Sequence, residues 1–205
     1  MMIHFPRRAL RCAALATLLL PAAAADYTSG DFTYKLNDDG SAIITRYSGS
    51  AAALTIPSSL DGHTVKQIGS YAFEKNTTLT SVSIPETVTE LEYSAFMDCT
   101  SLTAVTIPSG LTKAGSLGNS AFSGCSALTT VQFGSGLASI PEALFEGTGL
   151  KTVTLPESVT SIGSWAFANC AKLEQVHFPA NLTSIGLSAF ENCTALTAVT
   201  LPDGL

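Results

Sequence analysis

The sequence predicts a solenoid of the α/β or mainly β class, in which about six coils of about 23 residues stack along one axis. Two marks repeat along most of the chain: an apolar residue followed by proline, and a phenylalanine some residues later. The phenylalanines are Phe73, Phe96, Phe122, Phe145, Phe167 and Phe190. Their intervals are 23, 26, 23, 22 and 23 residues. A fixed period of this size indicates coils that bury their apolar sides only against their neighbours.

Each coil contains one short alternating run, for example Leu173, Val176 and Phe178. This Leu-x-x-Val-x-apolar order is the pattern of the strand in a leucine-rich repeat. The proline after most of these runs lacks an N–H group and cannot continue a ladder, so a turn must follow. We therefore expect a right-handed solenoid with a parallel sheet, and with short turns or helical pieces around the Ala-Phe pairs.

The composite repeat I-P-x-x-V-T-x-I-G-x-x-A-F-x-x-C-x-x-L-x-x-V-x-I-P resembles the BspA-like group of bacterial leucine-rich repeats. The resemblance covers residues 54–205, the predicted solenoid, which ends partway into a seventh coil. Leucine-rich repeats in general carry Asn or Cys three residues after the strand, whereas this chain has Thr87, Gly110 and Ser158 near that point. The resemblance implies a secreted or surface-exposed protein with a role in adhesion to host proteins or other cells.

Residues 1–25 have the composition of a secretory signal peptide. Three arginines precede an apolar run, and the segment ends in small residues. The uncharged stretch from Cys12 to Ala25 is 14 residues long, shorter than the roughly 20 that span a bilayer. We expect cleavage near Ala24 or Ala25, a secreted or cell-surface location, and no stable membrane insertion afterwards.

The charge of the remaining chain is strongly acidic. Removing three of the 10 basic residues leaves 7 against 16 acidic ones, a net charge of −9. Because such a surface repels phosphate groups, and no basic patch offsets it, we expect no nucleic-acid partner.

Residues 26–53 differ from the repeats and are expected to form an N-terminal capping β-hairpin. Alternating runs flank the turn Asn37–Gly40, which has the Asp-Gly pair typical of hairpins. A hairpin here would shield the first edge strand from pairing with another chain. A calcium loop is the alternative reading of Asn37, Asp38 and Asp39, but the EF-hand spacing is absent.

Two coils contain insertions in the same part of the coil, between the strand-end proline and the phenylalanine. The interval from the strand-end proline to the phenylalanine is 16 residues after Pro57 and 14 after Pro108, against 11 elsewhere. Insertions in repeat proteins often lie on a binding face, which makes His63 and Lys113 candidate loop contacts. Drift in a tolerant loop explains the same insertions.

Four cysteines remain after cleavage, each three residues after its phenylalanine: Cys99, Cys125, Cys170 and Cys193. An even count in a secreted protein is compatible with disulfides. One thiol at the same apolar position of successive coils is also what internal packing produces. Parallel Cα–Cβ vectors give poor disulfide geometry, so buried free thiols are the favoured interpretation.

The side chains on either side of each central strand valine should point away from the core and form an uncharged, hydroxyl-rich face. The candidate contact residues are Ser81, Ser83, Thr106, Thr130, Gln132, Thr152, Thr154, Gln175, His177 and Thr200. The β-propensity of threonine explains this composition too. The face is also suited to many weak contacts with an extracellular protein or a glycan.

These patterns favour a binding or adhesion protein over two other classes. A structural spacer in a larger surface assembly is the main alternative. An enzyme is disfavoured because the two histidines of the mature chain lie five coils apart and no nucleophile and acid converge with them. No catalytic, cofactor-binding or metal-binding residue is predicted.

Overall fold

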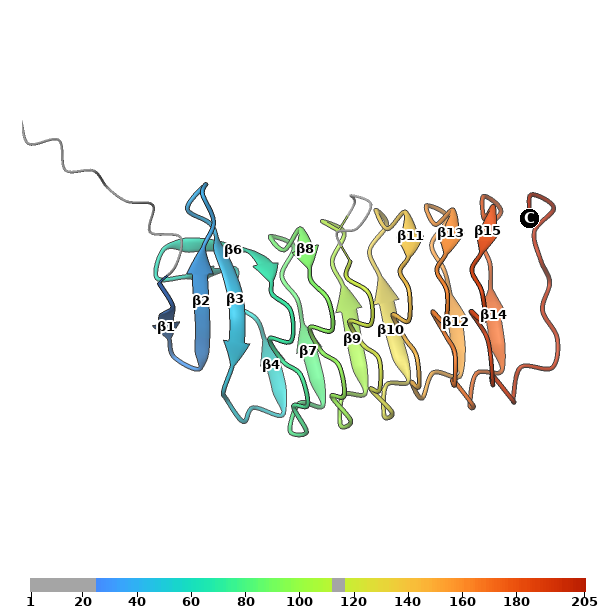
Figure 1. The fold of residues 1–205 in the computed structure, drawn as a ribbon, viewed down its shortest axis with the longest axis horizontal. Helices are drawn as coiled ribbons and strands as arrows, with labels where there is room; N and C mark the ends of the chain where they lie inside the picture. Colours follow the sequence, from blue (N-terminus) through green and yellow to red (C-terminus); the bar gives the residue numbers. More distant parts are fainter. Residues whose placement is uncertain (1–24, 112–116) are drawn as a thin grey trace, which may run out of the picture.

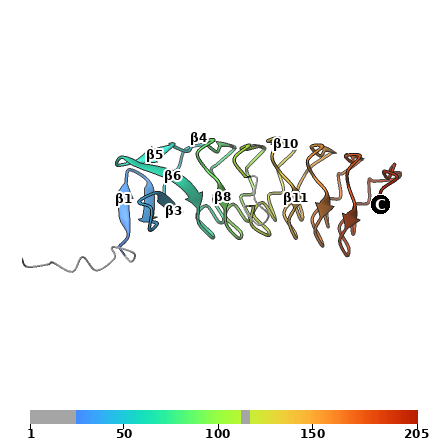
Figure 2. The ribbon, with the colours of Figure 1, turned by 90° about the horizontal axis from the view of Figure 1, so that it is seen from above.

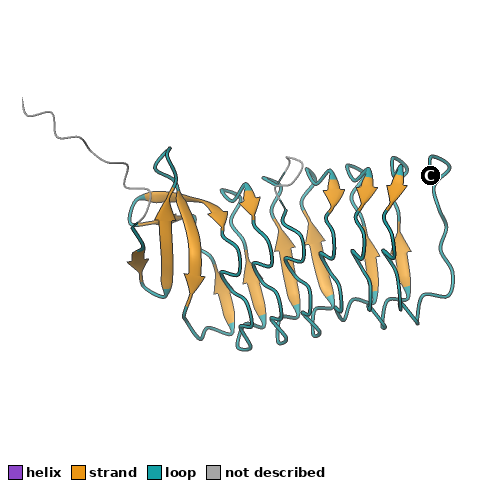
Figure 3. Cartoon of the chain, viewed as in Figure 1, coloured by secondary structure: helices purple, strands orange, loops and turns teal. Residues whose placement is uncertain are grey.

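The computed structural model describes residues 25–111 and 117–205, which form 15 strands and no helix (Figures 1 and 3). The strands are β1 (Tyr27–Ser29), β2 (Phe32–Leu36), β3 (Ala42–Tyr47), β4 (Ala53–Thr55), β5 (Ser59–Leu60), β6 (His63–Ile68), β7 (Ser81–Ser83), β8 (Glu90–Leu91), β9 (Ala104–Ile107), β10 (Thr130–Phe133), β11 (Ser139–Ile140), β12 (Thr152–Thr154), β13 (Ser161–Ile162), β14 (Gln175–His177) and β15 (Ser184–Ile185). The coils follow one another along the long axis, so the molecule is the predicted β-solenoid. We number the coils 1 to 6 by their phenylalanines, from Phe73 to Phe190.

Two rows of parallel strands run along the stack. One row consists of β4, with Leu54 at its centre, and of the strands that contain the central valines, β7, β9, β10, β12 and β14. Shorter strands form a second row that includes β8, β11, β13 and β15. Figure 2 shows the two rows on different sides of the stack. The signal for the second row is a single Ser-Ile or Glu-Leu pair per coil, too short to read as a strand from sequence.

The first row is parallel throughout, as expected, but it is divided into two sheets. Strands β4, β7, β9 and β10 form one parallel sheet, whereas β12 and β14 form another. The break coincides with a missing residue in coil 4, where Phe145 and Leu150 are five positions apart while Phe122 and Leu128 are six apart. At the shortened turn the backbones of coils 3 and 4 are in close contact, because a Cβ atom at Gly149 would lie 2.6 Å from the Ser126 carbonyl oxygen. At this point in the described chain β10 pairs only with β9 and β12 only with β14, so β10 and β12 do not pair with each other.

The N-terminal end is a larger cap than one hairpin. Strands β2 and β3 pair antiparallel around the Asn37–Gly40 turn, as the alternating runs predict. The sheet continues in the order β1-β2-β3-β6-β5, with β3 and β6 parallel. The first insertion therefore does not form the exposed loop that we expected: β5 and β6 are an antiparallel hairpin of the cap, with Leu60 and Val65 buried.

The Ala-Phe segments are turns, and none of the helical pieces considered above is formed in them. Each segment has a residue with positive φ two positions before its phenylalanine, such as Tyr71 at 60° and Trp165 at 54°. Another follows two positions after the phenylalanine, such as Asn169 at 61°, or is replaced there by a glycine. Left-handed residues so close together exclude a right-handed helix.

The core is a stack of phenylalanine rings. Adjacent rings of the six coils have centroids 4.5 to 5.8 Å apart and lie within 20° of parallel. The backbone carries a ladder beside them: the Phe96 N–H donates to the Ala121 carbonyl at 2.8 Å, and the Phe122 N–H to the Leu144 carbonyl at 3.0 Å. Each coil is thus held to the next by both ring contact and hydrogen bonds.

The four cysteines lie beside this stack as buried, unpaired thiols. Each sulfur donates at 3.1 Å to the phenylalanine carbonyl of an earlier coil, for example Cys125 Sγ to Phe96 O. Coil 4 has Thr148 at this place, and its hydroxyl donates to the Phe145 carbonyl at 2.9 Å. A small donor at this position satisfies a carbonyl inside the core.

We expect the native thiols to resist alkylation at neutral pH. All four sulfurs are buried and inaccessible. Burial also raises the pKa of Cys170 and raises that of Cys193 to about 11, so at these two positions the reactive thiolate is scarce. Mass spectrometry of residues 26–205 treated with iodoacetamide should show little modification in buffer and four added groups after unfolding in urea without reductant. Fewer than four groups under the second condition would mean that disulfides form.

Candidate ligand-binding face

The strand geometry places the predicted contact residues on the outside of the solenoid. All ten lie on the strand row or in the segment after it, and all are exposed except Ser81, which is half-buried. The central valines Val82, Val105 and Val153 are buried beneath them. The sequence alternation therefore identified correctly which side chains face solvent; their role in ligand contact stays a prediction.

Two shallow hollows lie on this face, one near each end. A hollow of about 240 Å³ lies over β4, β7 and β9 and is lined by Ser81, Ser83 and Thr106. A second of about 400 Å³ lies beside β14 and is lined by Gln175, His177 and residues 198–202. Neither is enclosed, so the face offers area and hydroxyl groups rather than a deep small-molecule pocket.

The break in the sheet divides the face. Thr130 and Gln132 lie on the last strand before it, and Thr106 Oγ1 donates to Gln132 Oε1 across β9 and β10 at 3.3 Å. Thr152 and Thr154 open the second part. A ligand that contacts both hollows must therefore cross the gap between β10 and β12.

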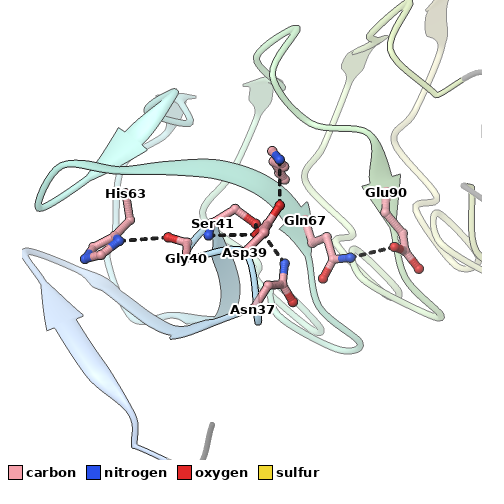
Figure 4. Close-up of polar contacts among 8 residues, drawn as sticks. Asn37, Asp39, Gly40, Ser41, His63, Gln67 and Glu90 are labelled. Atoms are coloured by element: carbon pink, nitrogen blue, oxygen red, sulfur yellow. Dashed lines mark hydrogen bonds and ion pairs between the residues drawn. The ribbon is translucent and has the colours of Figure 1, made fainter. Parts of the chain in front are cut away.

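Of the two candidate loop contacts, the structure describes only His63. His63 begins β6 in the cap, where its Nδ1 lies 2.8 Å from the Gly40 carbonyl oxygen, so it is a hairpin residue rather than a loop tip (Figure 4). Lys113 lies outside the described residues.

The acidic turn considered as a calcium loop has its oxygens occupied by protein donors. Asp39 Oδ1 accepts from the Ser41 N–H at 2.9 Å and from the Ser41 hydroxyl at 2.6 Å, and Oδ2 pairs with Lys66 Nζ at 2.7 Å (Figure 4). These contacts, Lys66 first, hold the pKa of the Asp39 carboxyl well below its usual range. In residues 25–111 and 117–205, no group of three or more His, Cys, Asp or Glu is arranged to hold a metal ion.

Sequence reasoning missed one surface feature. Trp165 is 40% exposed, although it lies only two positions before Phe167, which is fully buried in the core. Tyr71, Tyr93 and Leu187 are exposed on the corresponding turns of other coils. The sequence does contain a signal for this feature. The residue directly before the Ala-Phe pair, or before Leu144-Phe145 in coil 4, is Tyr71 in coil 1 and Trp165 in coil 5, whereas it is Ser or Ala in the other four coils.

No helix in the described part of the chain is long and apolar enough to cross a membrane. The predicted signal peptide lies almost entirely in residues 1–24, outside the described residues.

The fold and the exposed strand face define a bacterial-type leucine-rich repeat protein. The family model of the BspA-type leucine-rich repeat region matches residues 47–170 and 112–205, with six copies. The chain therefore belongs to the BspA-type leucine-rich repeat family, as its composite repeat predicted.

Solved structures agree with this assignment. The chain is 36% identical to a leucine-rich cell surface protein from Faecalibacterium prausnitzii A2-165, with a TM-score of 0.63 over 86% of this chain and 54% of that one. It is 27% identical to a leucine-rich repeat protein from Bacteroides ovatus, with a TM-score of 0.71 over 88% and 54%. A leucine-rich repeat protein from Eubacterium ventriosum is 28% identical, with a TM-score of 0.76 over 88% and 47%. The chain thus spans about half the length of these proteins, and no curated protein matches it.

Proposed function

We propose that the protein is a secreted or surface-exposed binding module that contacts an extracellular protein or a glycan through the strand face. The observation that carries this proposal is the row of exposed, uncharged polar side chains with a hollow near each end. Hydroxyl and amide groups are hydrogen-bond donors and acceptors with little desolvation cost compared with charged groups. The description of the F. prausnitzii protein as a cell surface protein supports the location.

A non-binding spacer is the competing function. A uniform solenoid can hold other domains apart without contacting anything, and the β-propensity of threonine would then explain the face. Catalysis has less support, because His177 lies on an open surface and His63 lies in the cap at the other end of the stack.

The test is a binding screen of residues 26–205 against extracellular matrix proteins and glycans, followed by two face variants. One variant carries alanine at Ser81, Ser83 and Thr106; the other carries alanine at Thr152, Thr154, Gln175 and His177. We expect one or both to weaken binding by about tenfold or more, since a few central residues dominate most interfaces. The variant that has the larger effect identifies the half of the face that binds.

The matched control replaces Thr160 and Thr183, which are also exposed threonines but lie beside the second strand row. Their replacement by alanine should leave binding unchanged. If no ligand binds the wild-type protein more tightly than the face variants, the spacer function takes the place of this proposal. Turnover of a substrate that His177→Ala abolishes would instead indicate an enzyme.

A further inference from the structure

The exposed large apolar side chains of the described residues are concentrated on one edge of the solenoid. Outside the C-terminal segment there are four: Tyr71 (50% exposed), Tyr93 (47%), Trp165 (40%) and Leu187 (71%). All four lie in the short turns that precede the Ala-Phe pairs. We call these four residues the aromatic edge; it is separate from the strand face described above.

The backbone places the members of the aromatic edge in two adjoining pairs. The Tyr71 N–H donates to the Tyr93 carbonyl at 3.2 Å, and the Trp165 N–H donates to the Leu187 carbonyl at 3.0 Å. The Tyr71 and Tyr93 rings pack edge to face with centroids 5.5 Å apart. Because Tyr71 and Trp165 belong to coils 1 and 5, the two pairs lie roughly 19 Å apart at about 4.8 Å per coil.

The fold does not need these rings. The positions equivalent to Tyr71 and Trp165 hold Ser94, Ser120 and Ser188 in other coils, with the same positive φ. A bulky side chain in this left-handed conformation is uncommon and strained. Serine meets the backbone requirement without exposing an apolar ring, so the turn conformation does not account for Tyr71 and Trp165.

The same turns are acidic. The six segments that surround the phenylalanines, residues 69–75, 92–98, 118–124, 141–147, 163–169 and 186–192, contain six acidic residues and one basic residue. The acids are Glu74, Glu92, Asp98, Glu142, Glu146 and Glu191, and the base is Lys75. Lys75 pairs with Glu74 at 2.8 Å, which offsets its charge. The edge is therefore negative as well as aromatic.

This combination selects a cationic partner. Trp and Tyr rings attract the guanidinium of arginine or the ammonium of lysine over their faces, and arginine also pairs with carboxylates in a bidentate manner. Complementary charge steers such a partner to the edge and repels anionic ones. Roughly six residues of extended peptide cover the span between the two pairs, at about 3.3 Å per residue.

We propose that the aromatic edge binds an extended, arginine- and lysine-rich segment of a partner protein, with cationic side chains on Tyr71, Tyr93 and Trp165 and salt contacts to the flanking carboxylates. This site is independent of the strand face, so either proposal can fail without the other.

The test uses residues 26–205 and a synthetic ten-residue peptide of alternating arginine and glycine. Trp165 is the sole tryptophan of the protein and reports on the site directly. We expect the peptide to change Trp165 fluorescence, and calorimetry to show an affinity that falls as salt is raised from 50 to 300 mM. The matching peptide with glutamate in place of arginine should not bind.

Two variants, Tyr71→Ser and Trp165→Ser, test the binding site without changing the stability of the fold. Serine already occupies the equivalent positions of three coils, so both variants should keep the wild-type melting temperature. Each should weaken binding of the arginine peptide by about 5- to 30-fold in calorimetry, the factor that corresponds to loss of one cation–π contact. Alanine at Thr160 and Thr183, which belong to neither proposed site, is the control and should leave the affinity unchanged.

Three outcomes would overturn the proposal. The first is no binding of the arginine peptide at 50 mM salt. The second is binding that Tyr71→Ser and Trp165→Ser leave intact, which would indicate nonspecific attraction to the acidic surface. The third is binding of a neutral oligosaccharide that does not depend on salt. If Tyr71→Ser and Trp165→Ser abolish that binding and the arginine peptide does not compete with it, the edge is a glycan site.

Discussion

Phe122→Ala is expected to lower the free energy of unfolding by about 3 to 5 kcal/mol, the usual cost of removing a buried phenylalanine ring. Phe122 is fully buried and lies in the middle of the stack, with ring centroids 5.4 Å from Phe96 and 5.8 Å from Phe145. Its loss leaves a cavity that neither neighbour can fill, because each is held by its own coil. Urea unfolding followed by circular dichroism measures the change.

Phe190→Ala is the matched control. Phe190 is half-buried and is the last ring of the stack, so its removal costs fewer contacts. The loss of stability should be clearly smaller than for Phe122→Ala. Equal losses at both positions would show that the rings stabilise their own coils and not the contacts between coils.

Gly163→Ala is expected to destabilise the protein by about 1 to 3 kcal/mol, the usual range for overpacking. A Cβ atom at this position would lie 2.6 Å from the Glu142 nitrogen and 2.8 Å from the Pro141 carbonyl carbon, both in the preceding coil. These are backbone atoms, so relief requires the coils to separate. The Gly163 N–H donates to the Ile140 carbonyl at 2.7 Å, and separation would strain that bond.

Gly204→Ala provides the same substitution without the clash. Its Cβ atom would lie 3.6 Å from the Leu182 carbonyl oxygen, an ordinary contact. Thermal unfolding should show a lower melting temperature for Gly163→Ala than for Gly204→Ala. Equal melting temperatures would mean that adjacent coils adjust their spacing freely.

Much of the architecture could be predicted from residue spacing alone. The recurrence of Phe73 through Phe190 indicated the stack, and alternation around Val82 or Val153 indicated which side chains face solvent. Both patterns repeat from coil to coil, so each further repeat supports the same prediction of coil spacing and side-chain direction. The candidate strand face followed from the same rule.

The aromatic edge could not be predicted in this way. Trp165 is two positions before Phe167, a place where an apolar residue reads as core. Its positive φ is shared by Ser94 and Ala143, which are buried, so φ alone does not decide which side chain at this position is exposed. Only the three-dimensional path of the turn distinguishes the buried Phe167 from the exposed Trp165.

By itself the sequence determined that coils of about 23 residues stack, which ring fills each coil, and which strand residues point outward, because these depend on periodicity within a coil. The tertiary structure decided that the first insertion becomes the β5–β6 hairpin of the cap and that the strand row breaks between β10 and β12. Both outcomes depend on how a segment lies against its neighbour: Val65 pairs with Ala42 of β3, and the break between β10 and β12 falls at the coil that has one residue fewer. Pairing between neighbouring segments depends on both segments together, so it cannot be predicted from the residues of one coil alone.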